Sequence, residues 1–264
     1  MAFASTFLVA FLTVAIFFNC LFAAALKRRD KSIVDVGWGI GFILVMLVTF
    51  AYSGTAEPRQ LLVGVLVLIW GLRLAIRIYR RNRGKGEGFR YKKWREDWGE
   101  HWRRHAYLFV FVGQGAMMLL ITIPIMLVNT CAGGALGWLD AAGVLIWLFG
   151  FCFEATGDYQ LDRFLQQPSN RGKVIESGLW RYTRHPNYFG EVTQWWGVYL
   201  IALAPPWGAL GVIGPVTITM LIVAYSGIPL LEKTMMKNPA HVEYAKRTSV
   251  FFPLPPKKPL RLGR

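Results

Sequence analysis

The sequence is poor in the side chains that build metal centres. Its 264 residues include three cysteines and four histidines. Cys20, Cys131 and Cys152 show no CxxC spacing, and the apolar runs around Cys20 and Cys152 predict small buried side chains there. His101 and His105 stand four residues apart, but they lie among arginines and tryptophans without obvious carboxylate or thiolate co-ligands. We therefore expect no metal site.

The first stretch of the chain lacks charge altogether. Residues 1–26 contain no charged side chain, and the first cations, Lys27–Arg29, come after the apolar run. Without a basic start, this run does not resemble a cleavable signal peptide. The chain also lacks a linker, a low-complexity segment and a convincing internal repeat, so we expect a single domain over residues 1–264.

Apolar residues are what the sequence has in excess. Hydrophobic residues make up 54% of the chain and the mean hydropathy is +0.36, which with long uncharged runs predicts an all-α, polytopic membrane bundle. We expect about seven transmembrane helices, of which the sixth is short unless it begins inside the polar motif that precedes it. The expected spans are 4–26, 33–53, 60–79, 106–128, 138–157, 192–206 and 208–231.

Basic residues alternate between the expected loops. Lysines and arginines number 4 in 27–32, 1 in 54–59, 10 in 80–105, 0 in 129–137, 5 in 158–191 and 8 in 232–264. By the positive-inside rule this pattern predicts an outside N-terminus and a cytoplasmic C-terminus. The net charge of +15 then reflects membrane topology and lipid headgroups, and nucleic acid is not an expected partner. We expect a multi-pass protein of the bacterial inner membrane.

One polar motif, Ser177 to Glu191, interrupts the apolar pattern. Pro186 suits the first turn of a helix, because its φ is fixed and it has no N–H. A helix that starts there places Asn187, Glu191 and Gln194 on one face. The cations at or before its positive end, where an anion is favoured, are Arg181, Arg184 and His185.

Three carboxylates before this motif form an acidic stripe. Glu154, Asp158 and Asp162 follow one another every four residues at the end of the fifth expected span. Like charges at this spacing repel unless cations pair with them. Candidate partners in the same loop are Arg163, Arg171, Lys173, Arg181 and Arg184. We expect a polar network in which Arg181, Arg184 and His185 divide between a phosphate and Asp158.

Other expected spans add polar residues. Asp35 opens the second span, and the glycines that follow it allow close approach by a neighbouring helix or a ligand. In the third span Arg77 is expected to snorkel to the headgroups, and Arg73, one turn deeper, is a candidate to face an internal ligand or a carboxylate. Gln114 in the fourth span either joins helices or contacts a substrate. Glu232 ends the last span, and a short helix within 239–253 is expected to fold back over the mouth of the bundle.

Most of these residues fall at the expected cytoplasmic ends of the helices, which predicts a pocket open to the cytosol. Arginines beside a helix N-terminus suit phosphates, asparagine and carboxylates suit ribose hydroxyls and amides, and tyrosines suit stacking or proton donation. The set favours a nucleotide-type cofactor over a transported ion. No GxGxxG motif follows a strand, so the site is not expected to be a Rossmann fold.

The motif also carries a family resemblance. Gly178-Leu-Trp-Arg-Tyr-Thr-Arg-His-Pro-Asn-Tyr-Phe-Gly-Glu191, with Trp195-Trp196-Gly197 after it, closely resembles the C-terminal signature of the steroid 5-alpha-reductase superfamily. Similar to its bacterial branch, the DUF1295 family, are Val34-Asp35-x-x-Trp38-Gly-x-Gly41, Trp70-Gly-x-Arg73-Leu, Arg90-Tyr91, Asp158-x-Gln160-Leu161 and Ser226-Gly-Ile-Pro-Leu-Leu-Glu232. The resemblance runs from about residue 30 to 253, which leaves a basic tail, 254–264.

The resemblance implies a seven-helix membrane reductase with NADPH in a cytoplasmic-side cavity. It implies hydride transfer to the β-carbon of an enone or a similar activated C=C bond. Asp158, Asn187 and Glu191 match residues of the family motif, and Asn82 with Arg83 resembles its Asn-Arg-Gly segment. The expected cofactor residues are Asn82, Arg83, Asp158, Arg163, Lys173, Arg181, Tyr182, Arg184, His185, Asn187, Tyr188, Glu191, Glu232 and Tyr244.

The expected substrate is a lipophilic small molecule. The steroid reductases of eukaryotes grip the substrate ketone with a Gln-Glu pair, which the second span of this chain lacks, and Asp35, Tyr91 or Gln114 is the candidate substitute. Trp38 and Gln114 are the expected substrate contacts. The candidate catalytic residues are Tyr91, Asp35 and Glu154. Membrane lipids are the other expected partners, and no obligate protein partner is evident.

Two alternatives remain open at this point. The Arg-His-Pro-x-Tyr-x-Gly core also resembles membrane methyltransferases of the isoprenylcysteine and phospholipid type, which bind S-adenosylmethionine with this core and a Glu-Glu pair. Here Lys233 follows Glu232, so the pair is missing. The second alternative is a lipid-binding or transport protein without catalysis, which predicts that Asn187→Ala and Glu191→Ala leave function intact.

Overall fold

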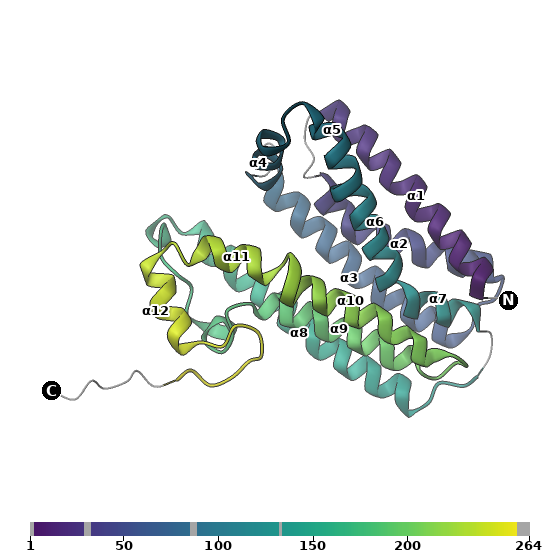
Figure 1. The fold of residues 1–264 in the computed structure, drawn as a ribbon. Coiled ribbons are helices and arrows are strands. Elements are labelled where there is room, and N and C mark those ends of the chain that lie inside the picture. Colours follow the sequence, from purple (N-terminus) through teal and green to yellow (C-terminus); the bar gives the residue numbers. More distant parts are fainter. Residues whose placement is uncertain (1–2, 29–32, 85–88, 132–133, 258–264) are drawn as a thin grey trace. The chain divides into compact units, whose positions relative to one another are not determined.

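The computed structural model describes residues 3–28, 33–84, 89–131 and 134–257, without the side chains of 89–92 and 95. Within these ranges the regular elements are helices, as the sequence predicts (Figure 1). The first seven α-helices are α1 Phe3–Arg28, α2 Ile33–Ser53, α3 Pro58–Asn82, α4 Phe89–Trp98, α5 Trp102–His105, α6 Gly113–Ile121 and α7 Ile123–Thr130. The others are α8 Trp138–Gln166, α9 Pro186–Ala202, α10 Ile213–Met220, α11 Ile228–Met235 and α12 Pro239–Arg247.

Short helical pieces of tighter or wider pitch complete the chain. Four 3₁₀ turns in the described residues are η1 Gly99–His101, η3 Pro168–Asn170, η4 Gly178–Arg181 and η5 Gly208–Val212. Two π-helical stretches are η2 Ala106–Val112 and η6 Leu221–Tyr225. The π-helical stretches join α5 to α6 and α10 to a short turn before α11, so the fourth and the last long helical segments are continuous but irregular.

Six helical segments of the described chain are long and apolar enough to cross a membrane, so this is an integral membrane protein. They are Phe3–Arg28, Ile33–Ser53, Pro58–Asn82, Glu96–Ile121, Trp138–Gln166 and Gly208–Met235. The expected sixth span, 192–206, corresponds to α9, which begins inside the polar motif and has 17 residues. The count of seven spans and the orientation of the termini remain predictions.

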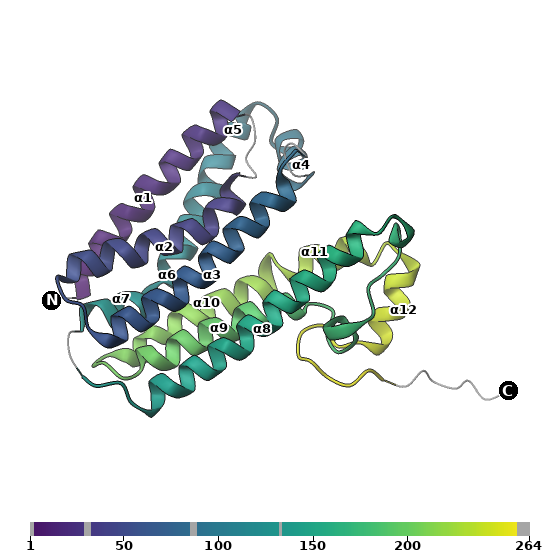
Figure 2. The same cartoon turned by 180° about the vertical axis from the view of Figure 1, so that it is seen from behind.

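The chain divides into two compact units, one of residues 1–141 with 199–214 and one of 142–198 with 215–264. In the first unit α1, α2 and α3 lie side by side with α6 and α7 packed on them (Figures 1 and 2). A methyl group on Gly39 of α2 would overlap the carbonyl oxygen of Gly71 of α3. The expected close approach at these glycines is therefore a contact between helices.

In the second unit α8 and α9 pack backbone against backbone. A Cβ atom on Gly190 would lie 2.5 Å from the Gly150 carbonyl oxygen, and one on Gly197 would lie 2.6 Å from that of Gly143. On each helix the two glycines are seven residues apart, which is two turns, so they form one stripe. This contact holds the first turns of α9 against the end of α8 that carries the acidic stripe.

Two cysteines differ from the expectation. Cys20 on α1 and Cys152 on α8 are exposed instead of buried. Both lie on apolar helices that are long enough to cross a bilayer, where an outward-facing small side chain meets lipid and not water. Apolar runs in a membrane helix therefore do not distinguish the buried face from the lipid face.

We predict that Gly190→Ala destabilises the protein by about 1–3 kcal/mol, because the new methyl group meets backbone atoms of α8 that cannot move aside cheaply. Thermal unfolding in detergent measures the effect. Gly113→Ala is the control, since its nearest atom, the Leu108 carbonyl oxygen, is 3.6 Å away and alanine favours a helix. Equal melting temperatures for Gly190→Ala and the control would contradict the close α8–α9 contact.

Candidate functional site

The motif segment, residues 178–185, is fastened to α8 by two hydrogen bonds. The Leu179 N–H donates to Gln160 Oε1 at 3.0 Å, and the buried Trp180 Nε1–H donates to the Gly157 carbonyl oxygen at 3.0 Å. Gly178 has a φ of 62°, which favours glycine, and a Cβ there would overlap the Gln160 amide. Within the Asp158-x-Gln160 pattern, Gln160 thus positions the motif segment, a role that the sequence did not reveal.

The helix after this segment begins at Pro186, as the sequence predicts. Asn187, Tyr188 and Glu191 are half-buried on its first two turns. One turn further, Gln194 is buried, and its Nε2 donates to Glu154 Oε2 at 2.5 Å. Glu154 and Asp158 are buried on α8, with 2% and 3% of their surfaces exposed. The predicted polar face of α9 therefore runs from half-buried at Asn187 to fully buried at Gln194.

Glu232, at the end of the last long helical segment, binds the cations of the motif. Its Oε1 accepts from Arg184 Nε at 3.1 Å and from His185 Nε2 at 2.8 Å, with its side chain 12% exposed. Arg184 Nη1 donates to the Ala245 and Thr248 carbonyl oxygens at 3.0 and 3.2 Å. The sequence assigned Arg184 and His185 to a phosphate and to Asp158. In the structure both bind Glu232, and their expected role at a phosphate stays a prediction.

His241 of α12 also faces this carboxylate. It is 1% exposed, its Nε2 lies 3.5 Å from Glu232 Oε2, and its Nδ1 has no hydrogen bond with any described residue. Burial lowers the pKa of His241 from its ordinary value, because the charged imidazolium is costly away from water, and attraction to Glu232 offsets this only in part. Despite two histidines and a glutamate, no group of described residues is arranged to hold a metal ion.

The segment after the last long helix packs on the motif segment. Thr183 Oγ1 donates to the Phe251 carbonyl oxygen at 2.8 Å, and the Arg184 N–H donates to the Ser249 carbonyl oxygen at 2.9 Å. The Tyr244 hydroxyl donates to the Trp180 carbonyl oxygen, and burial raises the pKa of Tyr244. The expected short helix is α12. Tyr244 holds the motif segment in place, and its expected contact with the cofactor stays a prediction.

Several other polar residues expected at or near the cofactor in this unit are exposed. They are the expected cofactor residues Arg163, Lys173, Arg181 and Tyr182, and Arg171, an expected partner of the acidic stripe, is exposed as well. Arg163 Nη1 donates to the Tyr159 hydroxyl at 3.1 Å. Arg181 precedes α9 by five residues, on the 3₁₀ turn η4 that Gln160 and Gly157 fasten to α8. A phosphate-bearing cofactor fits this donor set, with exposed cations for its phosphates and the half-buried Asn187 and Glu191 for hydroxyl and amide groups.

The remaining predicted residues belong to the first unit. Asp35 is half-buried in the first turn of α2, and Trp38 packs edge-on against Phe42 with ring centroids 5.4 Å apart. Asn82, the last residue of α3, is half-buried, and Arg83 is exposed. Gln114 is half-buried on α6 and Tyr91 lies on α4, where its side chain is outside the described part of the chain.

Sequence comparisons identify a family and several proteins that are similar to this chain. A family profile described as "Protein of unknown function (DUF1295)" matches residues 21–248. An uncharacterized protein of Schizosaccharomyces pombe, C594.04c, is 25% identical over 94% of this chain and 79% of its own length. The enzyme named 3-oxo-5-alpha-steroid 4-dehydrogenase 1 is 35% identical over 27% of this chain in Mus musculus and 39% over 22% in Bos taurus.

The similarity to these enzymes is confined to a short region. The aligned parts cover 26% of the mouse enzyme and 23% of the bovine one. No solved structure matches the chain.

We predict that Glu232→Gln destabilises the protein by about 3 kcal/mol, because Arg184 then stays partly buried without its counter-charge. The melting temperature in detergent should fall accordingly. Glu243→Gln is the matched control, since its pair with Lys246 joins side chains that are 68% and 65% exposed and contributes little. A Glu232→Gln protein that melts like the control would show that the carboxylate is not what holds the motif segment.

We also predict that the protein loses stability on mild acidification. The unfolded chain protonates His241 near its ordinary pKa of 6.5, whereas the folded chain, in which the pKa is lower, does not. The contribution of His241 to the free energy of unfolding is therefore fully present above about pH 6.5 and decreases as the pH falls below that value. The groups that face the imidazole are Glu232, Arg184, His185 and Tyr244, and the His241→Gln variant retains all of them.

Melting temperatures between about pH 7.5 and 5.5 measure the effect. His241→Gln should flatten the decline, and His101→Gln, at an exposed histidine, should leave it unchanged. An equally steep decline in His241→Gln would contradict the assignment.

Proposed function

We propose, from the premise that this chain belongs to the DUF1295 family, that it is a membrane-embedded, NADPH-dependent reductase. Its substrate would be a lipophilic molecule with an activated C=C bond, such as an enone. The family membership and the short matches to enzymes named 3-oxo-5-alpha-steroid 4-dehydrogenase 1 support oxidoreductase chemistry. The six long apolar helices support a substrate that reaches the protein from the bilayer. We propose the bacterial inner membrane, with the C-terminus in the cytoplasm.

The observation that carries this proposal is that the polar residues around α9 fall into two groups, those paired with Glu232 and those left for a ligand. Glu232 occupies Arg184 and His185, so these two residues shape the motif segment. Arg181 stays exposed just before α9, and Asn187 and Glu191 are half-buried on its first turns. A nucleotide needs this combination of an exposed cation for phosphate and partly desolvated polar groups for ribose and amide.

Each residue of this face then has a role. Arg181, with Arg163 and Lys173, binds phosphate oxygens through charge-assisted hydrogen bonds. The Asn187 amide donates and accepts, and the Glu191 carboxylate accepts from hydroxyl or amide groups. NADPH supplies the hydride when bound. Tyr188, which stacks on His185 with ring centroids 5.7 Å apart, is held in a fixed orientation.

A proton must also reach the substrate. Glu154, Asp35 and Tyr91 are the proposed donors, with Trp38 and Gln114 as substrate contacts. Glu154 is buried and accepts a hydrogen bond from Gln194, so water has little access to it. A carboxyl group in such a place can pass a proton to a bound substrate without exchange with bulk solvent.

We predict that NADPH raises the melting temperature of the purified protein and that Asn187→Ala weakens NADPH binding about tenfold, the cost of one lost buried hydrogen bond. Titration by nucleotide fluorescence measures the dissociation constant. Glu191→Gln should weaken binding as well, whereas Glu243→Gln, at an exposed site, is the control with unchanged affinity.

Two results would contradict the reductase. Absence of any NADPH binding by the folded protein is the first. Saturable binding of S-adenosylmethionine with no binding of NADPH is the second, and it would move the proposal to a methyltransferase. Unchanged affinity in both Asn187→Ala and Glu191→Gln would leave NADPH binding intact but contradict its location on α9.

A further inference from the structure

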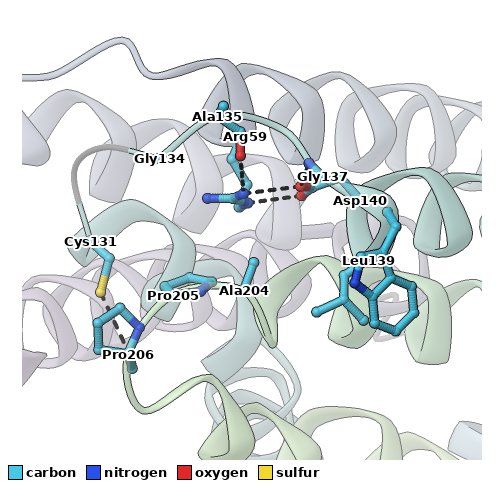
Figure 3. Close-up of a pocket in the computed structure, with 11 residues that line it drawn as sticks. Arg59, Cys131, Gly134, Ala135, Gly137, Leu139, Asp140, Ala204, Pro205 and Pro206 are labelled. Carbon is cyan, nitrogen blue, oxygen red and sulfur yellow. Dashed lines mark hydrogen bonds and ion pairs between the residues drawn. The ribbon is translucent and has the colours of Figure 1, made fainter.

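A second candidate site lies within the first unit. Cys131, residues within 134–140, the start of α3 and residues 204–206 line an open hollow of about 480 Å³ (Figure 3). This volume falls in the range of small-molecule sites. Its walls are mostly apolar, with Leu139, Ala204 and Pro205 among them, and Cys131 stands at one end. None of these residues belongs to the reductase motif, so this inference does not depend on the proposed function.

The polar feature of the hollow is Arg59. Its residue surface is 8% exposed, and its Nε and Nη2 donate to the two oxygens of Asp140 at 2.8 and 3.0 Å. Nη2 also donates to the Ala135 carbonyl oxygen at 2.9 Å, and Asp140 accepts from the Gly137 N–H at 2.7 Å. A two-point ion pair between buried residues therefore fixes the guanidinium in one orientation.

One nitrogen of this guanidinium is left over. Nη1 makes no hydrogen bond with any described residue, and Figure 3 shows it pointing away from Asp140 toward the side where Gly134 and Cys131 lie. A Cβ atom on Gly134 would stand 3.4 Å from it, so glycine keeps the space beside it open. Nη1 therefore keeps its two N–H groups for the hollow, where a ligand oxygen can accept a hydrogen bond from a guanidinium that is already held in one orientation.

The charge of the site selects the ligand. Asp140 already neutralises Arg59, so a carboxylate or phosphate here would add an uncompensated negative charge in a largely buried place. A neutral acceptor avoids this cost. Trp138 and Trp207, beside the hollow, are 78% and 79% exposed, and exposed tryptophans at helix ends of a membrane protein mark the headgroup level.

We propose that this hollow binds a neutral carbonyl oxygen on an apolar body, with Arg59 Nη1 as the donor. Such a carbonyl has two sources, the acyl ester of a membrane lipid and a lipophilic ketone. Both place the oxygen at the guanidinium and the hydrocarbon along Leu139, Ala204 and Pro205. This ligand-binding role uses none of the residues that we propose for the cofactor.

The reactivity of Cys131 can report whether a ligand occupies the hollow, and this measurement leaves the Arg59–Asp140 ion pair unchanged. In a Cys20→Ser, Cys152→Ser protein, Cys131 is the remaining cysteine, it is half-buried, and it lines the hollow. The rate of its modification by N-ethylmaleimide is measured in nanodiscs of ether-linked phosphatidylcholine, which has no ester carbonyl. We expect undecan-2-one to slow the modification several-fold, and undecane and undecanoate to have little effect.

Two variants test separately the hydrogen-bond donor, Arg59 Nη1, and the volume of the hollow. Arg59→Lys keeps a cation for Asp140 but removes Nη1, so protection by undecan-2-one should disappear, whereas Arg103→Lys, at an exposed arginine, should keep it. If Arg59→Lys does not fold, Ala204→Trp replaces it. The indole then fills the hollow and abolishes the ketone effect, and Leu136→Trp, outside the hollow, does not.

The outcomes divide cleanly. Protection by the ketone in ether lipid, with an unchanged basal rate in ester-linked lipid, supports a ketone site. A slower basal rate in ester-linked nanodiscs, lost in Arg59→Lys, supports a lipid ester. Equal protection by undecane, stronger protection by undecanoate, or no protection under any condition would each overturn the proposal, the last because water alone then satisfies Nη1.

Discussion

The second unit depends on one carboxylate that is held away from water. Glu232 accepts from Arg184 and His185 through one oxygen and faces His241 with the other. One negative charge balances one arginine, so a protonated His241 would leave an excess positive charge in a buried place. This balance agrees with the lowered pKa of His241. The same carboxylate connects the motif segment, the last long helix and α12, which are far apart in the sequence.

The glycine contact between α8 and α9 supplies the second constraint. Gly190 packs against Gly150, and Gly197 packs against Gly143. The two backbones are so close there that a larger side chain on α9 would overlap backbone atoms of α8. The short distance brings Gln194 within a hydrogen bond of Glu154. Glu232 fixes where α9 begins, and the glycines fix how closely it lies on α8. Together they leave Asn187 and Glu191 as the polar groups that are half-buried near an exposed arginine.

Local chemistry was predictable from the sequence, and long-range pairing was not. The fixed φ and missing N–H of Pro186 were enough to predict that a helix begins there. The glycines of α2 likewise predicted a close contact. The partner of Arg184 lies 48 residues away, and the Arg59–Asp140 pair spans 81 residues. No periodicity encodes such distances. Asp158 and Glu232 were equally good partners by charge, and only the fold decides between them.

The central claim is that Arg184 shapes the site while Arg181 contacts the cofactor, and the two nucleotides NADPH and NADH test it directly. They differ by one phosphate, so the ratio of their dissociation constants reports the residue that holds it. We measure this ratio for Arg181→Ala and Arg184→Lys. The account predicts that Arg181→Ala moves the ratio toward one, and that Arg184→Lys lowers the melting temperature and leaves the ratio unchanged. A ratio that collapses in a stable Arg184→Lys protein would contradict it.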